Sequence, residues 1–339
     1  MNSRERVYKA VHFQLPDRIP LRFMIGPAAQ VKHGQAIVDI FGGEPDDFGE
    51  FVRLVPRTEW DGYYRFGDWV DEWGVRWHNA VDGLIGVALG CPLEDWKKFD
   101  GYQPRRLPAE EEIKRFDDVI ESAGHQYFQT IIPSWDLQLF ERMHYLRGFQ
   151  RVMEDLATGS KEIYRLRDMI HELNMEVFRR LVRTHADYLV FQDDWGTQTS
   201  MLISPAAWRR FFKPCYAELF EMVRRSGKDL YFHSDGYVQE IMKDLVDIGV
   251  NIFNVQHSIM DTRYLGREFG GKVCFACYID LQFVLPRGDR RQIFQEVART
   301  VELLNFSGGG VIGIVYGDAD TSLENVRWSL EAWRSEGKL

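Results

Sequence analysis

The second half of the chain alternates between short apolar runs and longer amphipathic segments. The segments between most of the runs show helical periodicity and recognisable ends, such as the N-cap and proline pair Ser204-Pro205. Strands that alternate with helices in this way predict a parallel sheet. Five runs have the length and the β-branched or aromatic content of buried strands: DYLVFQDD (187–194), DLYFHSD (229–235), NIFNVQ (251–256), VCFACYID (273–280) and GVIGIVYGD (310–318).

Three runs in the first half could supply further strands: IPLRFM (19–24), FVRLVP (51–56) and YFQTII (127–132). Eight strands in one continuous pattern predict a single (β/α)₈ barrel that takes up residues 1–339 as one domain. Residues 60–108 break the rhythm with many aromatic, glycine and acidic residues. We expect them to form an excursion after the second strand, with short β-hairpins over one end of the barrel.

The composition limits the binding partners and the cellular location that can be expected. The 339 residues are 45% hydrophobic and 27% charged, which is enough apolar material for a sizeable core. The net charge of -9 without a long basic tract argues against nucleic acid and anionic membranes as partners. The polar start is unlike a secretory signal, and no run approaches the ~18 apolar residues of a membrane helix. Four cysteines make no disulfide framework in a chain this long, so we expect a cytoplasmic protein.

Polar side chains gather where the predicted strands end. Active sites of (β/α)₈ barrels lie at the carboxyl ends of their strands. His233 and Asp235 point to the same side because the side-chain period of a strand is two, which suits a metal ion or a general base with an orienting partner. Asp193 and Asp194 alternate, so only one can face inward, and the other would cap a helix or a turn. The strand ends carry Asp193, Asp194, His233, Asp235, Gln256, His257, Asp280, Tyr316 and Asp318.

Each of these features also has a structural interpretation. A His-x-Asp pair can be a satisfied hydrogen-bonded pair, and His257 can be a solvated loop residue. Cys274 and Cys277 resemble a CxxC motif, but residues i and i+3 of a strand face opposite ways, so core packing is expected. The excursion holds six aromatic residues that could wall a pocket for a flat or apolar ligand or could simply form core: Trp60, Tyr63, Tyr64, Trp69, Trp73 and Trp77.

Several motifs in order along the whole chain resemble the uroporphyrinogen decarboxylase superfamily. That superfamily has the (β/α)₈ fold and two main activities: cofactor-independent decarboxylation of uroporphyrinogen III, and zinc-dependent methyl transfer to or from a corrinoid protein. The motifs are RERVYKAVHFQLPDRIP, DEWGVRW, LRGFQRVMEDLA, FQDDWGTQ with LISP, FHSDGYV, LPRGDRRQIFQEV, GGGVIGI and TSLENV.

The decarboxylase branch fits the sequence poorly. Its members resemble one another in an Arg-Gln-Ala-Gly segment after the first strand, where this chain has Met24-Ile25-Gly26-Pro27. A substrate with eight carboxylates needs a basic pocket, whereas the strand ends here are mostly acidic.

The methyltransferase branch fits better. Its coenzyme M members carry His-x-Cys at the matching strand and a second cysteine after the last strand. Here His233 keeps the histidine, Asp235 stands in place of the cysteine, and the last strand ends Tyr316-Gly317-Asp318. This harder N/O site could still bind Zn²⁺ and polarise an ether or phenolic oxygen. The chain has no DxHxxG-type cobalamin motif, so a corrinoid would arrive on a partner protein.

The resemblance and the pattern together give one hypothesis and two alternatives. We expect a methyltransferase that moves a methyl group from a small methoxylated or methylated compound to a corrinoid protein. The alternatives are a decarboxylase acting on a smaller acid and a barrel that only binds a ligand. Family members are often dimers, so a homodimer is one expected form.

We assign the predicted roles as follows. Without a metal ion, His233 would act as a general acid or base whose tautomer Asp235 fixes. The predicted catalytic residues are His233, Asp235, Asp193 and Asp194; the metal ligands are His233, Asp235 and Asp318; the substrate contacts are Gln256, His257, Tyr316, Trp195 and Trp73.

Overall fold

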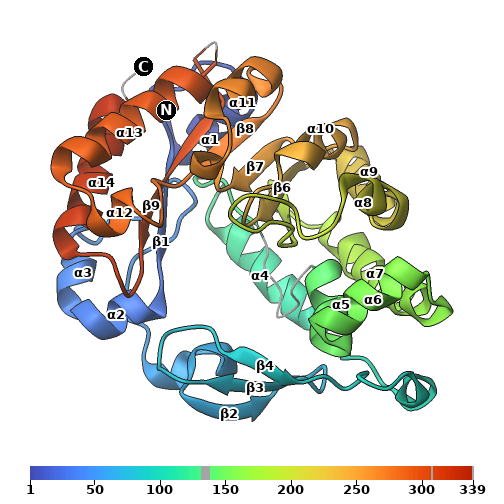
Figure 1. Ribbon diagram of the computed structural model, residues 1–339. Coiled ribbons are helices and arrows are strands. Elements are labelled where there is room, and N and C mark those ends of the chain that lie inside the picture. The colour runs from blue at the N-terminus through green and yellow to red at the C-terminus, as the bar shows by residue number, and fades with distance from the viewer. Residues whose placement is uncertain (131–137, 307, 338–339) are drawn as a thin grey trace.

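The computed structural model describes residues 1–130, 138–306 and 308–337. Within these residues, six parallel strands in the order β1-β9-β8-β7-β6-β5 curl into the wall of an α/β barrel (Figure 1). The predicted barrel fold is confirmed, and each of these six strands coincides with a predicted apolar run. The strands of the wall are β1 (Leu21–Ile25), β5 (Tyr188–Gln192), β6 (Asp229–Ser234), β7 (Ile252–Val255), β8 (Cys274–Cys277) and β9 (Val311–Gly317).

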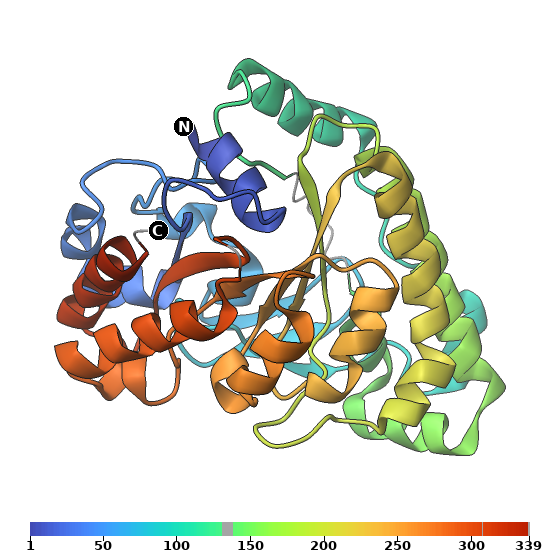
Figure 2. The same cartoon turned by 90° about the horizontal axis from the view of Figure 1, so that it is seen from above.

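Helices surround the curled sheet on its outer side, as the view from above shows (Figure 2). Ser204 caps α8 through its side chain, with Pro205 in the first turn, as the sequence predicted. The helices are α1 (Ser3–Val11), α2 (Pro27–His33), α3 (Gln35–Asp39), α4 (Glu110–Ser122), α5 (Phe140–Arg147), α6 (Phe149–Thr158), α7 (Lys161–Leu181), α8 (Pro205–Phe211), α9 (Lys213–Ser226), α10 (Gln239–Asp247), α11 (Thr262–Phe269), α12 (Val284–Arg287), α13 (Arg290–Leu304) and α14 (Leu323–Glu336).

The wall between β1 and β5 is irregular, and here one strand prediction is wrong. Residues 51–56 form no strand. The edge of β1 is instead satisfied by two side chains, because the N–H groups of Leu21 and Phe23 donate to the carboxylates of Asp47 and Asp46 at 2.8 and 2.9 Å. A ladder partner is not needed where carboxylates take the N–H groups.

The predicted third strand, 127–132, lies partly outside the described residues. Its described part, 127–130, is not a regular strand, but it bridges the remaining gap through the backbone. The Phe128 N–H donates to the Asp47 carbonyl at 3.4 Å, and the Asp187 N–H donates to the Gln129 carbonyl at 2.8 Å. In the described part of the chain, irregular segments therefore stand where regular strands were expected.

The two faces of the curled sheet form two separate cores. The inner face contributes alternate side chains such as Tyr231, Ile252 and Ile314 to one buried cluster, and the outer face packs against the helices. Cys274 belongs to the inner cluster and Cys277 to the outer one. The prediction that this CxxC sequence is core packing is confirmed, since the two thiols lie on opposite faces.

The excursion forms a small antiparallel sheet, β2-β3-β4, that lies apart from the barrel wall (Figure 1). Its strands are β2 (Gly67–Val70), β3 (Arg76–Asn79) and β4 (Val87–Gly90). The short β-hairpins expected in residues 60–108 are therefore present. Four 3₁₀ turns complete the described elements: η1 (Arg57–Glu59), η2 (Gly62–Tyr64), η3 (Trp96–Gly101) and η4 (His257–Ile259).

Among the described helices, none combines the length and the apolar character that crossing a membrane requires.

Candidate functional site

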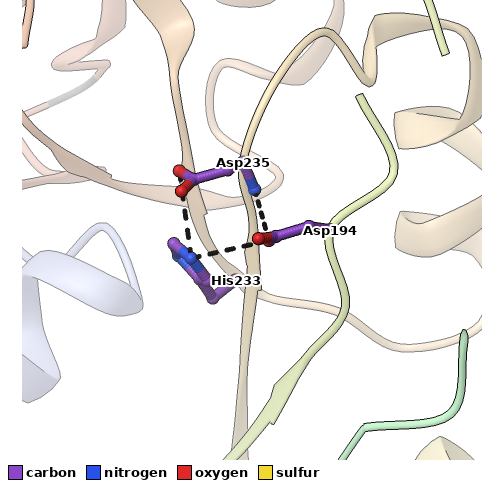
Figure 3. A group of neighbouring side chains, drawn as sticks. All are labelled: Asp194, His233 and Asp235. Carbon is purple, nitrogen blue, oxygen red and sulfur yellow. Dashed lines mark hydrogen bonds and ion pairs between the residues drawn. The ribbon is translucent and has the colours of Figure 1, made fainter. Parts of the chain in front are cut away.

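The carboxyl ends of β5 and β6 bring three ionisable side chains together (Figure 3). Gln192 pairs with His233 across the two strands, so Asp194 and Asp235, each two residues further along, follow on neighbouring strands. The Nε2 atom of His233 lies 3.8 Å from Asp194 Oδ1 and 3.9 Å from Asp235 Oδ1. These separations are too long for hydrogen bonds, and a space is left between one nitrogen and two carboxylates.

The other ring nitrogen of His233 is held by the next strand. Its Nδ1 atom lies 2.7 Å from Oδ1 of Asn254 on β7. The prediction that Asp235 orients the ring from behind is therefore wrong. Asp235 faces Nε2 instead, because both side chains point into the same space from one strand.

The two carboxylates are fixed by the backbone and by one amide. The N–H of Asp235 donates to Asp194 Oδ1 at 2.8 Å, and Gln256 Nε2 donates to Asp235 Oδ1 at 3.0 Å. Burial raises the pKa of Asp235 above its ordinary value, and the negative charge of Asp194 raises it further. A cation between the carboxylates would relieve this repulsion.

A cavity of about 810 Å³ opens from this group toward the excursion. Its walls come from the ends of β5 and β6, from α5 and from the β2–β4 sheet, so segments far apart in the sequence enclose it. Among the described residues that line it, six are carboxylic acids and two are arginines. The acids are Asp61, Asp71, Glu72, Glu141, Asp194 and Asp235, and the arginines are Arg105 and Arg142.

The aromatic residues of the excursion do wall this pocket, as the sequence suggested. Trp69 and Trp77 lie nearly parallel with ring centres 6.1 Å apart, and Tyr63 stands across both. Trp60 is the exception, because its indole N–H donates to the Val55 carbonyl and its ring is not part of the wall. The aromatic residues in the wall are Tyr63, Tyr64, Trp69, Trp73, Trp77 and Tyr145.

A single carboxylate organises the aromatic wall. Asp71 accepts the N–H groups of Trp73 and Val75, both at 2.9 Å, and the indole N–H of Trp77 at 3.0 Å. Arg142 of α5 lies 3.6 Å from the same carboxylate and 4.7 Å from the centre of the Trp73 ring. The excursion is thus tied to α5, and the predicted pocket residue Trp73 is placed where the two meet.

Glu141 is an acid of the cavity close to Asp194 that the sequence did not suggest. Glu141 of α5 lines the cavity, where it accepts hydrogen bonds from Tyr145 at 3.0 Å and Gln138 at 2.8 Å. Burial raises its pKa well above the ordinary glutamate value, and the charges of Asp194 and Asp193 raise it further. The raised pKa favours the protonated form of Glu141 at pH values where an ordinary glutamate is ionised. Its spacing of four from Tyr145 is the only signal the sequence offers, because this places both on one helix face.

Asp193 lies outside the pocket and caps a helix. It is 0% exposed, and it accepts the backbone N–H groups of Leu139, Phe140 and Glu141 at 2.8–2.9 Å, together with the hydroxyl of Tyr216. The predicted catalytic role is wrong for Asp193, since these donors saturate its carboxylate. The predicted alternation of the two aspartates is confirmed: Asp194 faces the cavity and Asp193 holds the start of α5.

Two predicted substrate contacts are buried elsewhere. Trp195 is 0% exposed; its ring stacks on Phe140 at 4.3 Å and its N–H donates to Tyr216. His257 is 3% exposed, and its Nε2 atom lies 3.2 Å from the hydroxyl of Thr300 on α13. Burial lowers the pKa of His257 to about 4, so the ring is neutral. Both predictions are wrong because the two side chains pack toward helices, Trp195 against α5 and His257 against α13.

The last strand end stays separate from the group of three. Asp318 accepts the Tyr316 hydroxyl at 2.9 Å and the Ala319 N–H at 2.7 Å. The Tyr316 ring packs edge-on against Tyr278 inside the barrel. Asp194, and not Asp318, is the third acid-base group beside His233 and Asp235 within the described residues.

A family model and a solved structure match this chain. The model of the family described as Uroporphyrinogen decarboxylase (URO-D) matches residues 140–335. A solved structure titled "methyltransferase from Methanosarcina mazei" superposes with a TM-score of 0.68 at 16% identity, covering 98% of both chains. The native xylanase 10B from Thermotoga maritima reaches a TM-score of 0.45 at 8% identity, with 98% of both chains covered. Among curated proteins, no sequence matches this chain.

Proposed function

Since the chain belongs to the uroporphyrinogen decarboxylase family, we propose that it is a methyltransferase that moves a methyl group from a small methoxylated or methylated compound to a corrinoid protein. One solved protein of the same fold is titled a methyltransferase. The observation that carries the proposal is the open group of Asp194, His233 and Asp235 at the end of an aromatic-walled cavity.

This group suits a divalent metal ion. Two ligand atoms that each lie about 2.1 Å from a tetrahedral zinc ion are roughly 3.4 Å apart, slightly less than the 3.8 and 3.9 Å seen here. The donor set is one imidazole nitrogen and two carboxylates, and all three are partly buried. When bound there, Zn²⁺ would supply Lewis-acid chemistry toward the ether or phenolic oxygen of the methyl donor.

The remaining work falls to the chain's own side chains. The aromatic wall would hold a flat donor by ring contacts, and a cavity of about 810 Å³ is far larger than a one-carbon alcohol needs. Glu141 would hold a proton on its carboxyl group and give it to the oxygen that loses the methyl group. The corrinoid would approach on its own protein, as the methyl acceptor.

The charge of the cavity disfavours a polycarboxylate substrate. Both arginines of the wall are already paired with acids of the excursion, Arg142 with Asp71 and Arg105 with Glu72. The other acids of the wall then leave it negative, which repels an anionic substrate with several carboxylates. A decarboxylase acting on a smaller acid stays the alternative.

Elemental analysis followed by one assay tests the proposal. We expect about one zinc per chain in the purified protein, because the site offers three protein side chains as zinc ligands. The protein is then mixed with cob(I)alamin and 2-methoxyphenol, and methylcobalamin is followed by its absorbance. The proposal is supported if methylcobalamin forms with the native protein but not without protein or with heat-denatured protein. Release of carbon dioxide from a panel of aromatic acids, without methyl transfer, would favour the decarboxylase instead.

A further inference from the structure

Asn254 is buried behind His233 and makes three polar contacts. It is 2% exposed and lies on β7, between β6 and β8. Its Nδ2 atom donates to the Ala276 carbonyl at 2.9 Å. Its Oδ1 atom lies 2.7 Å from Nδ1 of His233 and accepts the Tyr278 hydroxyl at 3.1 Å.

These contacts settle which way the amide points. The Ala276 carbonyl can only accept, so the amide NH₂ of Asn254 must face it. The Oδ1 atom is left for His233 and Tyr278, and an amide oxygen can only accept. Nδ1 of His233 therefore carries a hydrogen, and the lone pair of the neutral ring is on Nε2.

The position of that lone pair connects Asn254 to the candidate site. Nε2 is the nitrogen that faces Asp194 and Asp235. If the hydrogen were on Nε2, it would fill the space between the carboxylates and leave no nitrogen ligand there.

The neutrality of the amide matters as well as its direction. An imidazole that binds a metal ion is a neutral ligand, and the amide behind it adds no charge, so the ligand set carries only the two charges of Asp194 and Asp235. A divalent ion would balance them, and the balanced site would keep more Lewis acidity than one with an extra carboxylate.

We propose that Asn254 is the positioning residue of this site: it holds His233 in the tautomer that presents the Nε2 lone pair to the space between Asp194 and Asp235, and Tyr278 holds Asn254. The link to metal binding rests on the proposed function. The tautomer itself does not, so the two can fail separately.

The tautomer is measured first, in metal-free full-length protein labelled with ¹⁵N-histidine. Long-range ¹H–¹⁵N correlations distinguish Nδ1–H from Nε2–H, and the His233→Gln spectrum identifies the signals of His233. We expect Nδ1–H in the wild type and in Asn254→Asp, whose carboxylate accepts the same hydrogen. Asn254→Leu should lose the preference. An unchanged tautomer in Asn254→Leu, or Nε2–H in the wild type, would overturn the proposal.

Zinc affinity gives the second measurement, by competition with a chromophoric chelator. Loss of the orienting partner should weaken binding by about 10- to 100-fold in Asn254→Leu, while Asn254→Asp binds at least as tightly as the wild type. Equal affinity in Asn254→Leu and the wild type contradicts the positioning role. A wild type that binds no zinc, with the expected tautomers, refutes the metal of the proposed function and leaves the positioning of His233 supported.

Asn325→Leu is the matched control. Asn325 is also buried, at 5% exposure, and its amide donates to the carbonyls of Leu285 and Gly288 at 2.7 and 3.1 Å, away from the cavity. We expect a similar loss of stability with the His233 signals and the zinc affinity unchanged. If this control moved them equally, the effect at Asn254 would be general loosening and the proposal would fall.

Discussion

Aspartates at the two ends of the barrel wall have opposite surroundings. At the amino end, Asp47 accepts hydrogen bonds from Arg6 and Arg18, each at 2.7 Å, and from the Leu21 N–H at 2.8 Å. At the carboxyl end, Asp194 and Asp235 have no arginine or lysine within ion-pair range among the described residues.

The comparison shows that burial alone does not make a carboxylate a functional site. Asp47 is 1% exposed and Asp193 is fully buried, yet both are saturated by donors and serve the fold. Asp194 and Asp235 are more exposed, and the Oδ1 atom of each, which accepts a single hydrogen bond, faces a histidine nitrogen across an open space. The carboxylates of the site can still bind a cation, whereas those of the scaffold are already saturated by donors.

The largest effect should come from removing the nitrogen of the open site. We expect His233→Ala to lose bound zinc and to slow methyl transfer by at least about 10³-fold, because Lewis-acid assistance contributes several kcal/mol. Elemental analysis and the methylcobalamin assay measure both. The control is His257→Ala. It also removes a histidine at the end of a neighbouring strand, but this histidine contacts Thr300 and not the cavity. Zinc retained at full stoichiometry in His233→Ala would move the metal elsewhere.

The second largest effect should be a difference in stability between variants at the amino end and at the carboxyl end of the barrel wall. Asp47→Asn removes the charge that pairs with Arg6 and Arg18, and we expect the free energy of unfolding to fall by about 3 kcal/mol. In metal-free protein, Asp194→Asn should change it by no more than about 0.5 kcal/mol, or raise it, since an unpaired carboxylate is removed. Denaturant titrations followed by circular dichroism compare the variants. Equal losses would mean that the two ends are alike.

The sequence predicted the regular part of the fold because the signal there is local. Each strand of the second half is a buried apolar run, and its identity depends on its own residues. The position beside β1 has no such signal, since carboxylates of Asp46 and Asp47 replace a strand there. The run at 51–56 looks apolar, but Phe51 and Leu54 are 55% and 42% exposed.

The part of the site that depends on the alternation of side chains along a strand was predictable from the sequence. The period of two correctly paired His233 with Asp235 and separated Asp193 from Asp194. It could not show that the side chains of Trp195 and His257 pack against helices, which buries them. Nor could it place Glu141, whose helix reaches the cavity only through tertiary packing.

Glu141, the acid of α5 that lines the cavity with Asp194 and Asp235, should make the stability of the protein depend on pH. The folded pKa of Glu141 is raised above that of the unfolded chain, so the folded state holds the proton more tightly. Its contribution is therefore fully present below about pH 4.5 and is lost as pH rises toward the folded pKa. Between pH 5 and 7, metal-free wild type should lose about 2 kcal/mol relative to Glu141→Gln, which cannot titrate. Unfolding curves at several pH values measure this difference, and parallel profiles would show that Glu141 is ionised.

The smallest effect concerns the aromatic wall, which should bind the donor without holding the metal. We expect Trp69→Leu to weaken binding of 2-methoxyphenol by about 10-fold, roughly 1.4 kcal/mol, because an indole face in contact with a ring is lost. Zinc affinity should not change, since Trp69 lies on β2 and the proposed ligands lie at the carboxyl ends of β5 and β6. Calorimetry measures both constants in the same samples. Trp96→Leu is the control, because Trp96 is also partly buried but packs on Phe99 and Arg147, away from the cavity wall. If both variants bind the donor equally well, the excursion shapes the pocket without contacting the donor, and the open end of the barrel alone determines binding.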